Sequence, residues 1–256
     1  MYSLIISVLP VIVLAIIIYI NDKNKEPAKL LFKLFLSGFL SVILTLIISG
    51  ILEAASPIFK ITKDLSFIQL FISIYIGVGL VEEFSKWIMV YLVSYHENEF
   101  DEMYDMIVYS TFVSLGFACI ENILYVMSKG VYVGIIRAVL SVPGHTFFGV
   151  FMGYYLGLAK ISSINNNESL EKKNKYLSII VPTLLHGTFD YLLSLESIIY
   201  LLLFLIFVVL LYIYAIKKIK RISNIPRKFK YKDNYCSNCG TKVETNYCPT
   251  CGRKNE

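Results

Sequence analysis

Charged side chains are scarce in this chain: Asp, Glu, Lys and Arg make up 17% of its 256 residues, against about 25% in a typical soluble domain. Hydrophobic residues reach 56%, and the mean hydropathy is +0.65. Soluble domains of this size rarely have such a composition. Apolar runs of about 20 residues recur along the sequence, which is the signature of membrane-spanning helices.

Cysteine is almost absent outside the C-terminal tail. The one exception, Cys119, lies alone in an apolar run and is expected to be a small buried filler. The clustering of the other four in the tail argues against a disulfide framework and favours a metal site in a reducing compartment. The other four cysteines form two Cys-x-x-Cys pairs, each followed by glycine, at Cys236, Cys239, Cys248 and Cys251. Such a pattern is typical of a short ribbon in which four thiolates hold a structural zinc ion.

Seven apolar runs predict an all-α polytopic membrane protein of about seven transmembrane helices followed by the zinc ribbon. The runs cover about 2–20, 30–52, 67–95, 106–127, 133–159, 176–195 and 198–216. The expected organisation is a multi-span domain at 1–216, a basic cytoplasmic linker at 217–234 and the ribbon at 235–253. No basic region precedes the first run, so we interpret it as an uncleaved span. Residues 160–175 are polar and are predicted to form a loop.

Lysine and arginine predict the orientation in the membrane. Eight basic residues lie between Lys217 and Lys232, so this end is expected to be cytoplasmic, and seven spans then place the N-terminus outside. Attraction to the membrane surface explains these cations as well as nucleic acid would, so we do not expect nucleic acid as a partner. The ribbon is expected either to dock a cytoplasmic protein partner or to stabilise the tail.

Two adjacent carboxylates, Glu82 and Glu83, interrupt the third apolar run. A charged side chain at the bilayer centre costs about 2.5–3.5 kcal/mol on insertion scales, so such residues usually face a polar cavity and have a function. On a helix the two side chains point about 100° apart, and Lys86 shares a face with Glu82. A purely structural Glu82–Lys86 ion pair would leave Glu83 unexplained. We therefore interpret the pair as candidate general acid/base groups.

Other polar groups lie within later apolar runs at a similar depth. His186 and Asp190 are one helical turn apart, so the carboxylate can orient the imidazole. His145 precedes glycines at every fourth position, a spacing that lets helices approach closely, so the same histidine could instead serve only a tight helix interface. Arg137 is expected near the outer interface or paired with an acid. Glu121 and Asn122 are expected either to hold the catalytic groups through hydrogen bonds or to bind the ligand directly.

Four ordered motifs together resemble the PrsW family of intramembrane proteases, which is similar to the CAAX prenyl endopeptidases and their bacterial self-immunity relatives. The motifs are Glu82-Glu83-x-x-Lys86, then Gly116-Phe117-Ala118 leading to Glu121-Asn122 and Tyr125, then His145 ahead of Gly149 and Gly153, and Leu185-His186 with Asp190. The resemblance implies that Glu82 and Glu83 are the essential acidic pair and that His145 and His186 are the essential histidines. It also implies first-site cleavage of membrane-bound anti-sigma factors in a bacterial plasma membrane. The prenyl endopeptidases usually have asparagine where this chain has Asp190.

The chemistry expected from these residues is peptide hydrolysis, with one glutamate activating a water and the histidines polarising the carbonyl. The site either needs no cofactor or holds a metal; we favour a glutamic mechanism because the chain has no His-Glu-x-x-His run. The expected substrate is a single-pass membrane protein. The alternative is a transporter or an immunity-type binding protein that uses the same Glu/His cluster, although no internal repeat supports a transporter.

Overall fold

A computed structural model describes residues 2–62, 64–97, 99–224, 236, 239–241, 243, 247–251 and 253. Within these ranges seven helical stretches are long and apolar enough to cross a membrane, which agrees with the predicted number. The chain is therefore a multi-pass, all-α membrane protein with a cysteine cluster near its C-terminus. Residues 225–234 of the predicted linker lie outside the described residues.

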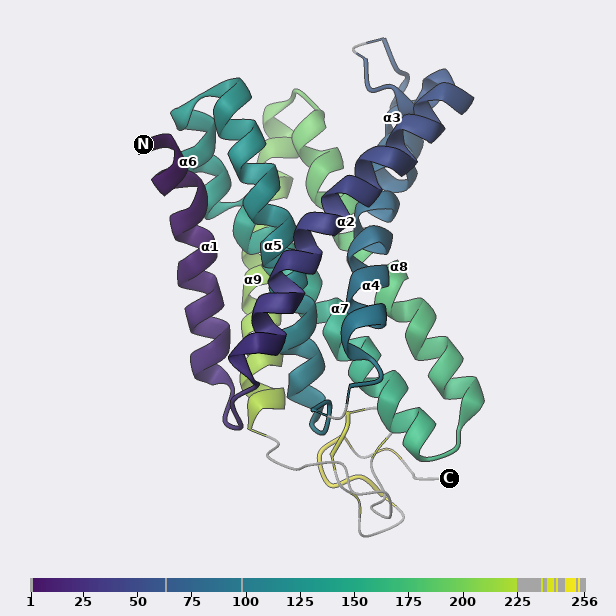
Figure 1. Cartoon of the computed structure of the whole chain (residues 1–256). Coiled ribbons are helices and arrows are strands. Elements are labelled where there is room, and N and C mark those ends of the chain that lie inside the picture. The colour runs from purple at the N-terminus through teal and green to yellow at the C-terminus, as the bar shows by residue number, and fades with distance from the viewer. Residues whose placement is uncertain are drawn as a thin grey trace.

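The helices form one bundle around α5, most of which is buried (Figure 1). Its neighbours are α1, α2, α4, α6 and α7, and α8 covers the outer side of α7. The N-terminus lies at the upper end of the bundle in Figure 1 and the cysteine segment at the lower end. The elements are α1 Tyr2–Asn21, α2 Ala28–Ala55, a 3-10 turn Pro57–Phe59, α3 Phe67–Ile72, a π-helix Ser73–Leu80, α4 Val81–Ser94, α5 Met103–Lys129, α6 Val131–Val139, α7 Ser141–Ile164, α8 Glu168–Ser194 and α9 Ile198–Ser223.

The glycines that follow His145 bring α7 against α5, as their spacing predicts. A Cβ atom at Gly153 would lie 2.3 Å from the backbone oxygen of Met106 and 2.6 Å from the Cα of Ile107. Because a backbone cannot move aside as a flexible side chain can, only glycine fits at this crossing. The close approach fixes the depth of α7, and with it the position of His145.

We expect Gly153→Ala to destabilise the bundle by about 1–3 kcal/mol, the usual cost of overpacking a tight contact. Thermal unfolding of the purified protein in detergent measures the effect. Gly50→Ala is the matched control, because a Cβ at Gly50 meets nothing within 4 Å. Equal melting temperatures for the two variants would contradict this account of the α5–α7 crossing.

Three helix boundaries differ from the sequence prediction. The fifth apolar run is broken at Leu140 into α6 and α7, with Pro143 in the first turn of α7, where proline is tolerated. Residues 160–175 are not a loop: α7 continues to Ile164, and α8 begins at Glu168 after Asn167 caps it by accepting from the Leu170 amide. Helix α9 continues to Ser223, so the basic segment predicted as a linker begins as helix.

The turn between α1 and α2 is buried against the lower part of α5. Tyr109 donates a hydrogen bond to the carboxylate of Glu26, and Asn24 donates one to Glu102. Burial raises the pKa of Glu26 to about 7, although the bond from Tyr109 opposes this shift. These contacts close the lower end of the bundle beneath the polar cluster described next.

Candidate active site

The two glutamates of α4 have different surroundings. Glu83 is fully buried, whereas the side chain of Glu82 retains 13% exposure and lines a cavity. They occupy the first turn of α4, directly after the π-helix. Adjacent helical positions therefore place one carboxylate in the protein interior and the other at the cavity wall.

Lys86 connects both glutamates to His145. Its ammonium nitrogen lies 2.7 Å from Glu83 Oε1, 3.5 Å from Glu82 Oε2 and 3.1 Å from His145 Nδ1. The side chain is fully buried, with Nζ 3.9 Å from the centroid of the Phe117 ring. The sequence predicts the Glu82–Lys86 pair, but the shorter contact is with Glu83. Two carboxylates and an aromatic face therefore hold the buried ammonium group of Lys86 in one position.

His145 lies in the first turns of α7, with a partner at each ring nitrogen. An ammonium only donates, so Nδ1 of the neutral ring accepts from Lys86, and Nε2 carries the proton. Nε2 then donates to Glu121 Oε2 at 2.7 Å. Glu121 is also 2.7 Å from Arg137 Nη2. The acid expected for Arg137 is therefore Glu121, and this ion pair ties α6 to α5.

His186 lies on α8 between carboxylates from two helices. Its Nδ1 is 2.9 Å from Glu83 Oε1, and its Nε2 is 3.2 Å from Asp190 Oδ2 and 3.8 Å from Glu82 Oε2. A ring with a carboxylate at each nitrogen donates two hydrogen bonds as imidazolium. Phe148 stacks on the ring with centroids 5.0 Å apart, which holds its plane.

Close packing between the π-helix and α8 brings Glu83 to His186. A Cβ at Gly79 would lie 3.2 Å from the backbone oxygen of Thr183, and one at Gly187 would lie 2.5 Å from the Tyr75 ring. Tyr75 also hydrogen-bonds the Thr188 hydroxyl at 2.8 Å. π-Helical turns inside α-helices are frequently found at functional sites, and this one immediately precedes the glutamate pair.

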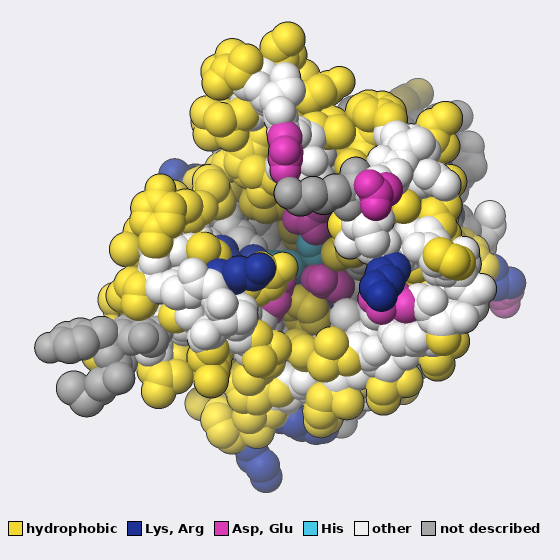
Figure 2. All heavy atoms as spheres, turned by 90° about the horizontal axis from the view of Figure 1, so that it is seen from above, with side chains coloured by type: hydrophobic (Ala, Val, Ile, Leu, Met, Phe, Trp, Pro, Cys, Tyr) yellow, Lys and Arg dark blue, Asp and Glu magenta, His cyan; other side chains and the backbone are white. Residues whose placement is uncertain are grey.

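A cavity of about 390 Å³ opens above these groups at the upper end of the bundle. Figure 2 shows this hollow from above, with acidic and histidine side chains at its floor and hydrophobic, basic and acidic side chains around its rim. Its polar lining comprises Glu82, Glu121, Tyr125, Arg137, Ser141, His145, His186, Asp190 and Ser194. A few converging polar groups at the floor of a cleft with largely apolar walls are typical of a ligand-binding or active site.

The structure brings together all the intramembrane candidates that the sequence suggests. Asn122 does not line the cavity. It donates a hydrogen bond to the backbone oxygen of Ser7 at 2.9 Å and accepts one from Arg137 Nε at 3.2 Å. Arg137 belongs to the site more closely than the sequence predicts, because it lines the cavity and contacts both Glu121 and Asn122. It is the only arginine before residue 221, which is the signal that could have identified it.

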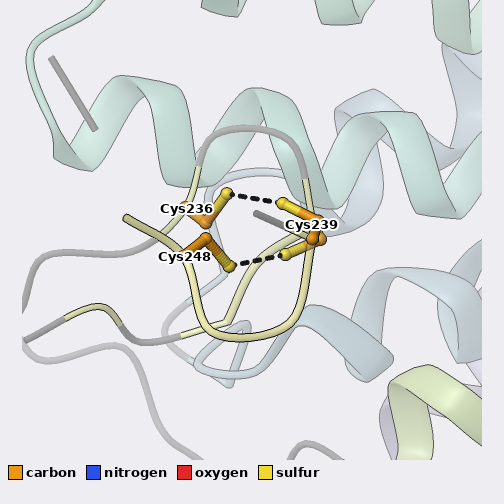
Figure 3. Close-up of side chains that lie close together, drawn as sticks. Cys236, Cys239 and Cys248 are labelled. Carbon is orange, nitrogen blue, oxygen red and sulfur yellow. Dashed lines mark hydrogen bonds between the residues drawn. The ribbon is translucent and has the colours of Figure 1, made fainter. Parts of the chain in front are cut away.

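The four tail cysteines form a second cluster, and Figure 3 shows Cys236, Cys239 and Cys248 pointing toward one another. Sγ separations are 3.5 Å for Cys236–Cys251 and 3.4 Å for Cys239–Cys248. Zinc–sulfur bonds of about 2.3 Å in a tetrahedron would place the sulfurs about 3.8 Å apart, so the cluster fits such an ion. Gly240 adopts φ +74°, the left-handed turn that the glycine after this pair predicts.

Comparison with known proteins places the membrane bundle in a family. The sequence model described as PrsW family intramembrane metalloprotease matches residues 26–215. The protein named Protease PrsW of Oceanobacillus iheyensis is 38% identical over 188 residues, 73% of this chain and 81% of the relative. Its namesake from Geobacillus kaustophilus is 39% identical over 197 residues (75% and 80%), and that of Bacillus subtilis is 36% identical over 199 residues (77% and 85%). No solved structure matches the chain.

Proposed function

Because the chain belongs to the PrsW family of intramembrane proteases, we propose that its Glu/His cavity hydrolyses peptide bonds of single-pass membrane proteins within or beside the bilayer. One observation carries the proposal. A carboxylate oxygen of Glu82 and ring nitrogens of His145 and His186 lie within 4.8 Å of one another, and all three residues line the same cavity. A water molecule and a carbonyl group would meet a base and the imidazolium of His186 there.

Glu82 is the general base in this proposal, and Glu83 is a positioning residue. Glu82 lines the cavity, and its Oε2 has two long contacts with cations, 3.5 Å to Lys86 Nζ and 3.8 Å to His186 Nε2, so its other oxygen can take a proton from water. Glu83 is enclosed by Lys86 and His186 and has no exposed surface. After attack, protonated Glu82 would return the proton to the leaving amine.

His186 stabilises the oxyanion in this mechanism. With Glu83 at Nδ1, its Nε2 points to the side where Glu82 and Asp190 lie. A preorganised cation at this point is worth most in a site that excludes water. The two ring nitrogens of His145 contact Lys86 and Glu121, so His145 forms the opposite wall of the cavity and keeps these two charged groups in place.

The family description names a metalloprotease, and the donor set permits a metal. Glu82, His145 and His186 would hold a divalent ion, since two imidazoles and one carboxylate are a known zinc ligand set. When bound, such an ion would polarise the carbonyl and acidify a water molecule. Both ring nitrogens of His145 are already engaged, Nδ1 by a cation and Nε2 as a donor. For this reason we favour carboxylate-driven water activation.

Metal analysis separates the two mechanisms and tests the zinc proposed for the ribbon. We expect one zinc per purified native chain, lost in Cys248→Ser and kept in Cys119→Ser, the matched control outside the cluster. His186→Ala should also keep one zinc. A second ion in the native protein that disappears in His186→Ala would establish the metal mechanism. Retention of zinc in Cys248→Ser would contradict the ribbon site.

Orientation and substrate follow from the same proposal. With the basic end of α9 cytoplasmic, the cavity opens toward the outer leaflet. A site there would act at the outer end of a substrate's transmembrane helix, as expected for first-site cleavage of an anti-sigma factor. The ribbon then lies in the cytoplasm, where we propose that it docks a protein partner.

Reconstitution tests the function and separates it from transport. The purified chain is placed in liposomes together with host single-pass membrane proteins, including anti-sigma factors, and products are identified by mass spectrometry. Cleavage next to a transmembrane segment, without proton flux across the same vesicles, is the expected result. Proton flux without cleavage would support the transporter instead.

A further inference from the structure

An apolar groove lies between α7, α8 and α9, away from the Glu/His cavity. Its volume is about 550 Å³, within the roughly 300–1,000 Å³ range of small-molecule sites. Phe151 and Tyr155 of α7 form its floor, and Val181, Leu185 and Phe207 are among its walls. Helices α8 and α9 are joined at the upper end of the bundle and diverge toward the lower end (Figure 1), which makes room for the groove.

The groove leads directly into a smaller basic pocket of about 110 Å³ at the cysteine end of the bundle. Tyr214, Lys217 and Lys218 line both spaces. The pocket adds Tyr154, Arg221, Ile222 and, from the ribbon, Cys239. Residues 207, 210, 214, 217 and 221 recur every three or four positions, so one face of α9 changes from apolar to basic along its length.

The three cations of this pocket have no carboxylate within 4.0 Å among the residues that the structure describes. Lys218 is half-buried, with Nζ 3.5 Å from the centroid of the Tyr154 ring. A lysine that serves only membrane topology extends its ammonium group to water. Lys218 is instead half-buried beside the exposed cations Lys217 and Arg221 at the end of an apolar groove, an arrangement that favours an anion at the groove's mouth.

We propose that the groove and the basic pocket together bind an anionic phospholipid. Its phosphate lies among Lys217, Lys218 and Arg221, and an acyl chain lies between α8 and α9. Basic pockets between transmembrane helices on the cytoplasmic side are sites for anionic headgroups. A partner's membrane helix would fill the apolar groove but leave the cations uncompensated. A free phosphate would satisfy the cations but leave the groove empty.

Native mass spectrometry of the delipidated, full-length protein tests this site. Dioleoyl phosphatidylglycerol is expected to bind at least tenfold more tightly than dioleoyl phosphatidylcholine. The variant Lys217→Gln/Lys218→Gln/Arg221→Gln should lose at least tenfold in phosphatidylglycerol affinity. Lys220→Gln is the matched control, because Lys220 is exposed on the same helix but lines neither space, and it should change the affinity less than twofold.

Three results would overturn the proposal. Native affinity in the triple variant would exclude the basic pocket, and an equal loss in Lys220→Gln would show general attraction to the basic helix end. Displacement of the lipid by millimolar glycerol 3-phosphate would show a free-phosphate site. Circular dichroism and melting temperature show whether each variant is folded. If the triple variant is misfolded, Lys218→Gln alone, with an expected loss of at least threefold, takes its place.

Discussion

Replacing Glu82 with glutamine is expected to lower the rate of substrate cleavage by about 10²–10⁴-fold, the usual contribution of a general acid/base. Glutamine has nearly the same shape but cannot take a proton from water. Glu82 lines the cavity, and its contact with Lys86 is the longer of the two glutamate contacts at 3.5 Å. The melting temperature should therefore change little. Cleavage in proteoliposomes with equal amounts of protein measures the effect.

Glu53→Gln is the matched control for this prediction, since Glu53 is exposed near the end of α2 and lies outside the cavity. It should leave the rate within twofold of the native value. Cleavage by Glu82→Gln within threefold of the native rate would contradict the assignment of the base. The base would then have to be another cavity carboxylate, Glu121 or Asp190.

Lys86→Met is expected to destabilise the protein by about 3–5 kcal/mol, because it leaves Glu83 buried without its closest cation. It should also abolish cleavage, since His145 loses the donor at Nδ1 that fixes its tautomer. Thermal unfolding in detergent gives the stability change. Lys33→Met is the matched control: the Lys33–Glu97 pair is exposed, so its loss should cost about 0–1 kcal/mol.

A second substitution separates charge from packing at Lys86. In Lys86→Met/Glu83→Gln the buried charge is removed with its partner, so most of the lost stability should return while cleavage stays absent. A single variant as stable as the native protein would show that Glu83 does not depend on Lys86. A double variant no more stable than the single one would assign the loss to packing around Phe117.

The spans and the cluster could be predicted because each rests on a local signal. Long apolar runs identify the helices, and charges within them are rare enough to identify Glu82, Glu83, His145 and His186. Which of the two glutamates Lys86 contacts more closely depends on packing between helices and could not be predicted. Helical spacing allows both i,i+3 and i,i+4 pairs, and Glu83, which also contacts His186 of α8, is the closer partner of Lys86.

Residues 160–175 contain local signals for helix in spite of their polar composition. Glu168–Lys172 and Glu171–Lys175 are charge pairs four residues apart, an arrangement that supports helix in a polar segment. Asn167 supplies the cap. The break at Leu140 is different, because proline near the start of α7 permits a new helix but does not require one.

The most direct test of an intramembrane protease is mapping of protein N-termini in the host membrane. Cells with the native chain are compared with cells that carry Glu82→Gln at equal abundance. New N-termini beside the transmembrane segments of single-pass proteins are expected only with the native chain, and these would also name the substrate. Identical N-terminal profiles in the two strains under several envelope stresses would contradict the proposed function.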